Sequence, residues 1–121
     1  MPRTRFIEHA GRKILLLDFS GIDDTHAALD AITEARELIA RQAPDGSLLT
    51  LTNVTASHFD SGVLKAIREL AEHNRPYVRA GAVVGLAGLM KVVYNTIIHL
   101  TGRNLKSFDD LDAAKAYLVA Q

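Results

Sequence analysis

Cysteine is absent from the sequence, and neither sign of charge is in excess. Without cysteine the chain forms no disulfide, holds no metal through thiolates and uses no cysteine nucleophile. The 14 lysines and arginines are balanced by 14 aspartates and glutamates, so no overall field steers the protein toward nucleic acid. We therefore expect neither thiol chemistry nor a nucleic-acid partner.

An apolar leader is also absent. The segment Met1–His9 has no apolar run of the kind that a secretory signal needs, so we expect a cytoplasmic protein. The 121 residues are enough for one domain with its own hydrophobic core. We therefore treat the whole chain as a single domain.

Charge is scarce between residues 80 and 102, where Lys91 is the single formal charge. A transmembrane helix is one interpretation, but a lysine at the bilayer centre costs about 2.5–3.5 kcal/mol. The β-branched pair Val83 and Val84 favours a strand instead, and glycines follow it. We expect a buried strand at Val78–Val84, a glycine turn, an apolar helix at Leu86–Leu100, and no transmembrane segment.

The rest of the chain alternates between strand and helix patterns. Turn and capping residues separate them: Gly11 lies in a hairpin connection, Asp24 precedes one helix and Asp110 precedes another. The predicted strands are Arg5–Glu8, Lys13–Phe19, Ser47–Asn53 and Leu105–Phe108. The predicted helices are Thr25–Gln42, Ser61–His73 and a last helix after Asp110. In the last helix we expect Leu111, Ala114 and Leu118 to face inward.

The element order is therefore β-β-α-β-α-β-α-β-α. Strands that alternate with helices of this length are joined by right-handed crossovers into a parallel arrangement, and the opening hairpin adds an antiparallel edge. The sequence thus predicts an α/β fold with a mixed, mostly parallel sheet flanked by helices.

Five segments follow one another along the chain in a characteristic order: Ile14–Gly21, Phe59–Leu64, Ala82–Gly85, Thr101–Asp110 and Ala113–Leu118. In this order they resemble the STAS-like family, the fold of bacterial anti-sigma-factor antagonists, and more narrowly the small bacterial STAS/SEC14-domain proteins. The resemblance implies a signalling module that binds a protein partner and is not an enzyme.

The start of the helix at 61–73 is where such antagonists carry a phosphorylation switch, in the pattern Asp-Ser-(Ser/Thr)-Gly. Alignment on Gly62 places Ser61 at the phosphoacceptor position, although Asp60 then replaces the family's first serine and Phe59 its aspartate. A simpler interpretation is that Asp60 or Ser61 caps the helix. The residues predicted to form the partner surface in this loop are Ser57, His58, Asp60 and Gly62.

The same region raises a hydrolase alternative. Parallel strands would bring Asp18 close to His58 and to Ser57 or Ser61, which are the three residue types of a catalytic triad. The chain has no Gly-x-Ser-x-Gly elbow, however, and Ser and Asp are also common turn and capping residues. We therefore expect no catalytic residues and keep a small hydrolase as the weakest alternative.

Metal and cofactor sites are not indicated. His26, His58 and Asp60 lack the spacing of a metal-binding motif. The glycines that precede the apolar helix do not form the Gly-x-Gly-x-x-Gly pattern of dinucleotide-binding proteins, and no phosphate-binding loop is present. We expect no metal and no cofactor.

The predicted helix 86–100 is apolar on more than one face, and a helix of this kind is buried on two sides. One side faces the sheet. The second side is covered by a neighbouring helix, by a second copy in a homodimer, by a partner protein, or by a lipid or small apolar ligand. An intermolecular contact is the favoured hypothesis, and its candidate residues are Met90, Val93, Tyr94, Ile97 and Ile98.

Overall fold

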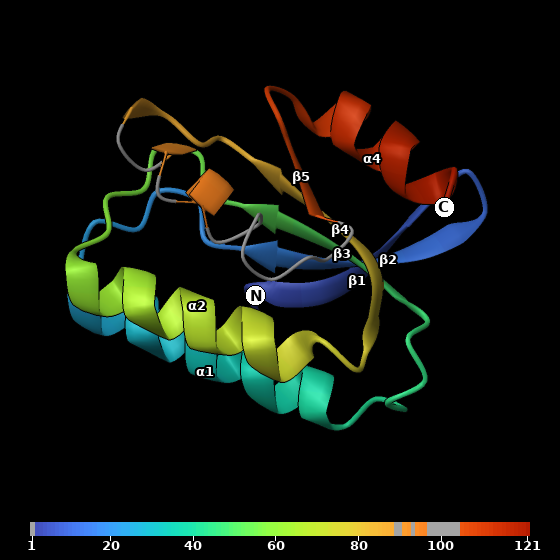
Figure 1. Ribbon diagram of the computed structural model, residues 1–121, viewed down its shortest axis with the longest axis horizontal. Helices are drawn as coiled ribbons and strands as arrows, with labels where there is room; N and C mark the ends of the chain where they lie inside the picture. The colour runs from blue at the N-terminus through green and yellow to red at the C-terminus, as the bar shows by residue number, and fades with distance from the viewer. Residues whose placement is uncertain (1, 89–90, 93, 97–104) are drawn as a thin grey trace.

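The computed structural model describes residues 2–88, 91–92, 94–96 and 105–121 (Figure 1). Within these ranges, the positions 88, 91–92 and 94–96 between β4 and β5 are helical. The elements are β1 (Thr4–His9), β2 (Arg12–Asp18), α1 (Thr25–Ala40), β3 (Leu48–Asn53), α2 (Ser61–Asn74), β4 (Val78–Val84), β5 (Leu105–Phe108) and α4 (Leu111–Val119).

The five strands form one sheet in the order β1-β2-β3-β4-β5. β1 and β2 are antiparallel, and the three remaining pairs are parallel. The antiparallel hairpin closes through Ala10 and Gly11, whose φ angles of 50° and 78° fit the type I′ turn that follows the twist of the strands. The mixed, mostly parallel sheet predicted from the sequence is confirmed.

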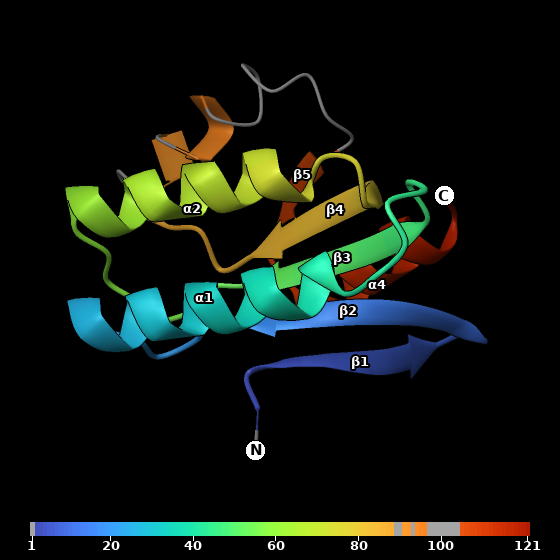
Figure 2. The ribbon, with the colours of Figure 1, turned by 90° about the horizontal axis from the view of Figure 1, so that it is seen from below.

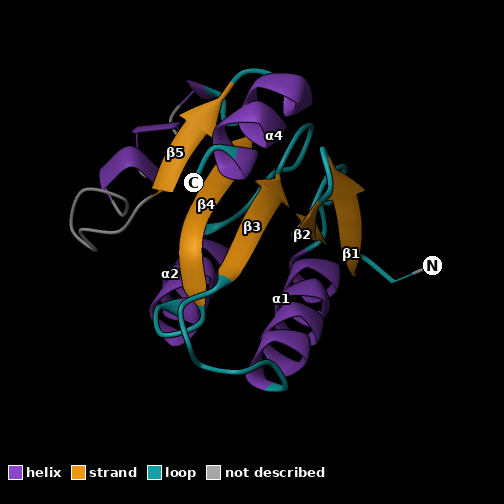
Figure 3. Cartoon of the chain, turned by 90° about the vertical axis from the view of Figure 1, so that its right-hand side faces the viewer, coloured by secondary structure: helices purple, strands orange, loops and turns teal. Residues whose placement is uncertain are grey.

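Helices cover the two faces of the sheet unequally. The residues of α1 and α2 pack with those of β2 on one face, and Tyr94 belongs to the same buried cluster. Ala114 and Leu118 of α4 pack against β3 and β4 on the other face. Figures 2 and 3 show α1 and α2 side by side on one side of the sheet and α4 alone on the other.

Three aspartates mark where the helices begin. The carboxylates of Asp24, Asp60 and Asp110 each accept a hydrogen bond from the backbone N–H three residues further on, at 2.8, 2.8 and 2.7 Å. An N-cap of this kind satisfies one of the N–H groups that the first helical turn leaves without a partner. For α2, the structure therefore decides between the two predicted caps in favour of Asp60.

Two sequence expectations are wrong in detail. Leu111 was expected to face inward but is 38% exposed, because α4 packs against the sheet through Ala114 and Leu118 further along the helix. Leu86 and Ala87 are not helical, so the apolar helix begins later than predicted. The positive φ angles of Gly85 (94°) and Gly88 (57°) bend the chain in this interval.

The bounds of β4 and β5 agree with the prediction. The charge-poor stretch thus opens with a strand of the sheet. In the parts of the chain that the structure describes, no helix combines the length and the apolar character needed to cross a bilayer.

Candidate functional site

The loops that follow β2 and β3 are joined by backbone hydrogen bonds at the carboxyl ends of the strands. The N–H of Gly21 donates to the carbonyl of Thr55 at 2.9 Å, and the N–H of His58 donates to the carbonyl of Ile22 at 2.8 Å. These bonds hold the loop before α2 at the edge where open α/β sheets bind their ligands. The predicted partner residues therefore lie at a position suited to binding.

A cleft of about 260 Å³ opens at this edge. Ser57, His58 and Phe59 line it from the loop before α2, while Gly85 and Ala87 line it from the segment after β4. The sequence predicted the two segments separately: the loop as a partner surface, Gly85 as part of a glycine turn, and Ala87 as part of the apolar helix. In the structure they form the two walls of one cleft.

Gly85 determines how closely the two walls approach. A Cβ atom at this position would lie 2.5 Å from the backbone nitrogen of Thr55 and 2.6 Å from its Cα, and the φ angle is +94°. Both the contact and the backbone conformation exclude a side chain here. The segment after β4 is therefore pressed directly against the loop after β3.

Asp60 joins the starts of the two parallel helices. One carboxylate oxygen accepts the N–H of Val63 at 2.8 Å, and the other accepts the hydroxyl of Thr25 in the first turn of α1 at 2.6 Å. These bonds lower the pKa of Asp60, with the hydroxyl of Thr25 as the largest cause and the N–H groups of Val63 and Gly62 adding to it. Asp60 is therefore ionised at neutral pH.

Ser61 is the first residue of α2 and is exposed. Because Asp60 supplies the cap, the hydroxyl of Ser61 is not needed for it. Among the described residues this hydroxyl has no hydrogen-bond partner. His58, Asp60 and Gly62 are exposed as well, and Ser57 is half-buried.

The triad of the hydrolase alternative is not assembled. The hydroxyl of Ser57 donates to the carbonyl of Val54 at 2.5 Å. One carboxylate oxygen of Asp18 accepts both the N–H and the hydroxyl of Ser20, at 3.1 and 2.5 Å. These groups complete local turns, and none of these bonds involves His58.

No family model matches the chain, and no curated protein matches it in sequence. Among the solved structures that are similar to this chain is an uncharacterized protein from the DUF3478 family with a SpoIIAA-like fold, from Shewanella loihica PV-4. The TM-score is 0.76 at 16% sequence identity, and the match covers 95% of this chain and 91% of that one. The fold is SpoIIAA-like, that is, STAS-like. At this identity the similarity establishes the fold and nothing further.

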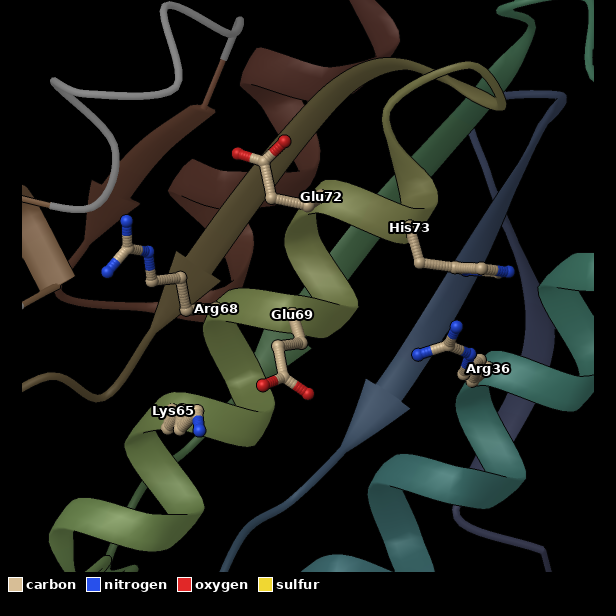
Figure 4. A pocket seen from close by; sticks show the side chains of 6 residues that line it. All are labelled: Arg36, Lys65, Arg68, Glu69, Glu72 and His73. Atoms are coloured by element: carbon tan, nitrogen blue, oxygen red, sulfur yellow. The ribbon is translucent and has the colours of Figure 1, made fainter.

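A second depression of the STAS-like fold was not anticipated from the sequence. A groove of about 570 Å³ runs between α1 and α2, with Arg36 on α1 across from charged side chains of α2 (Figure 4). Both signs of charge line the groove, and Glu72 contacts Arg75 at 3.9 Å. This mixture of charges does not favour a ligand of one sign. The lining residues are Arg36, Lys65, Arg68, Glu69, Glu72 and His73.

The apolar-ligand alternative falls largely on residues that the structure does not describe. Met90, Val93, Ile97 and Ile98 lie outside the described ranges. Tyr94 is buried and lines a cavity of about 30 Å³ between the STAS-like sheet and α2. That volume holds about one water molecule. It gives no support to a lipid site, and the carrier hypothesis stays a prediction.

Proposed function

We propose that this protein is a regulatory binding module without catalytic activity, which acts by contact with a protein partner at the carboxyl edge of its sheet. One observation carries the proposal: the loop before α2 and the segment after β4 line a common cleft, with Ser57 and Ala87 on opposite walls. A partner residue inserted there would contact apolar and polar groups together, as in the core of a protein–protein interface.

Ser61 is the proposed point of regulation, two residues after Phe59 in the wall of this cleft. A phosphate on its hydroxyl would meet the backbone N–H groups of the first turn of α2, where negative charge is favourable. It would also lie beside the ionised Asp60, and like charges at this distance repel. The phosphate would therefore compete with Asp60 for the N–H of Val63 and weaken the bond between Asp60 and Thr25.

The test is quantitative affinity purification from native cells, with the wild-type chain and three variants as bait. Ala87→Arg places a long charged side chain in the cleft. Ala116→Arg is the matched control, because Ala116 is exposed on α4 at the opposite face of the sheet. Ser61→Asp introduces negative charge at the regulated position. Circular dichroism checks that each variant is folded.

We expect the wild type to capture a set of proteins that Ala116→Arg captures in the same amounts. Ala87→Arg should lower the captured amount of these proteins at least tenfold. Ser61→Asp should change that amount. The cleft is not the partner site when Ala87→Arg captures the same proteins as the wild type. If Ser61→Asp changes nothing, the regulatory role of Ser61 is lost while the cleft proposal stands.

A further inference from the structure

The outer side of β1 is an open edge of the sheet, and no described strand pairs with it (Figure 2). The N–H of Asp18 donates to the carbonyl of Arg3 at 2.9 Å. In an antiparallel pair, successive residues direct their backbone groups alternately toward the partner strand and away from it, so this bond shows which residues of β1 face β2. By that alternation, Arg5 and Ile7 direct their backbone groups toward β2, and Thr4, Phe6 and Glu8 direct theirs outward.

Glu34 closes one end of this edge. Its carboxylate accepts the outward N–H of Thr4 at 2.7 Å, although the two residues are 30 positions apart. Thr4 is 1% exposed, so its N–H has no ready access to water in place of Glu34. This hydrogen bond is independent evidence that the backbone N–H of Thr4 points away from β2. It also means that a side chain of α1 covers the first N–H donor of the edge.

Phe6 lies at the centre of the part that stays open. Its side chain is 39% exposed and lies on the α1 face of the sheet, opposite Leu15 of β2. The ammonium of Lys13 lies 5.5 Å from the centre of its ring. Phe6 therefore combines an outward backbone pair with apolar surface that a neighbouring strand would bury.

We propose that the outer edge of β1 is a pairing surface for β1 of a second copy of this chain, and that Glu34 weakens this pairing. A two-fold axis at Phe6 lets Phe6 exchange both backbone hydrogen bonds with the partner's Phe6 and places the two rings together. The same register puts Thr4 opposite the partner's Glu8. The contact is self-complementary, as a two-fold interface requires.

The position of Glu34 conflicts with this pairing. Its carboxylate occupies the place on Thr4 that the carbonyl of the partner's Glu8 would take. It would also lie near the carboxylate of the partner's Glu8, on the same face of the sheet. Covering an edge donor with a charged side chain is one of the ways in which natural sheets resist edge-to-edge association.

The test measures the dimer dissociation constant of the full chain by sedimentation velocity over a concentration series. Glu34→Ala removes the competing acceptor from both halves of the interface, and we expect the dissociation constant to fall about tenfold or more. Glu37→Ala is the matched control, because it removes the same charge from an exposed position of α1. It should leave the constant within threefold of the wild type.

Two variants of Phe6 in the Glu34→Ala background locate the contact. Phe6→Pro removes the outward N–H without removing a bond to β2, and Phe6→Lys keeps the backbone but sets two like charges across the axis. Each should return the constant to the wild-type value. A Glu34→Ala chain that associates no better than Glu37→Ala, or a dimer that survives both changes at Phe6, would overturn the proposal. The cleft at Ala87 takes no part, so either outcome leaves the proposed function untouched.

Discussion

The hydroxyl of Thr25 donates a 2.6 Å hydrogen bond to the carboxylate of Asp60, and this bond joins the first turns of α1 and α2. Asp60 also caps α2 and is followed directly by Ser61, the proposed point of regulation. One exposed carboxylate thus caps α2 and connects it to α1. Any change in charge at Ser61 acts first on this carboxylate.

Replacement of Thr25 by Val should raise the pKa of Asp60 toward the ordinary value of 3.8, because the hydroxyl is the largest cause of its lowering. A carboxyl with a lowered pKa in the folded state stabilises the protein above the unfolded pKa, and this contribution is lost as the pH falls through the folded value. NMR titration of the Asp60 carboxyl measures the shift. Thr33→Val, at an exposed position of α1, is the control and should leave the titration unchanged.

The sequence predicted the sheet well because its signals are local. The strand Val78–Val84 lies between Pro76 and Gly85 and is apolar except for Arg79, and its bounds were predicted as observed. The cap of α2 was left open, since Asp60 and Ser61 are both good capping residues. The choice between them depends on which one adopts the extended backbone that precedes the helix, and Asp60 does, with a ψ angle of 178°.

The long-range contacts of the candidate site and of the β1 edge could not be predicted in this way. Asp60 meets Thr25, and Thr4 meets Glu34, across 35 and 30 positions of sequence. Each contact depends on how far α1 is shifted along the sheet, and no periodicity in a single sequence records that shift. Of the two cleft walls, only the loop before α2 was predicted as a contact surface. The other wall meets this loop at Gly85, and that contact depends on the register of β3 with β4.

Gly85→Ala should destabilise the protein by about 3 kcal/mol, since the new methyl group meets the backbone of Thr55 and the φ angle is unfavourable for alanine. Gly21→Ala is the matched comparison. Gly21 has a φ of +69°, but a Cβ there has no heavy atom within 4 Å, so we expect a loss of about 1 kcal/mol from the backbone conformation alone. Urea denaturation measures both. Equal losses would show that the contact with Thr55 adds nothing.

Thr4→Val should stabilise the fold by about 1 kcal/mol, because the buried hydroxyl of Thr4 has no hydrogen-bond partner in the part of the chain that the structure describes, and valine has nearly the same shape. Thr4→Ser keeps the hydroxyl and removes the methyl group, so it should be destabilising by about 1 kcal/mol. The midpoint of thermal unfolding separates the two variants. A less stable Thr4→Val protein would mean that the hydroxyl is satisfied in solution.

Arg12 ties the β1–β2 hairpin to the end of α4. Its guanidinium donates to the backbone oxygen of Val119, the last residue of α4, at 3.2 Å and to the backbone oxygen of Gln121 at 2.6 Å. Arg12→Ala should therefore raise amide exchange in α4 by about tenfold, which corresponds to about 1.4 kcal/mol of local opening energy. Arg79→Ala, at an exposed position of β4, removes the same charge and should leave α4 protected. Exchange that rises equally throughout the sheet would instead assign Arg12 to global stability, because a local anchor protects the helix it holds and little else.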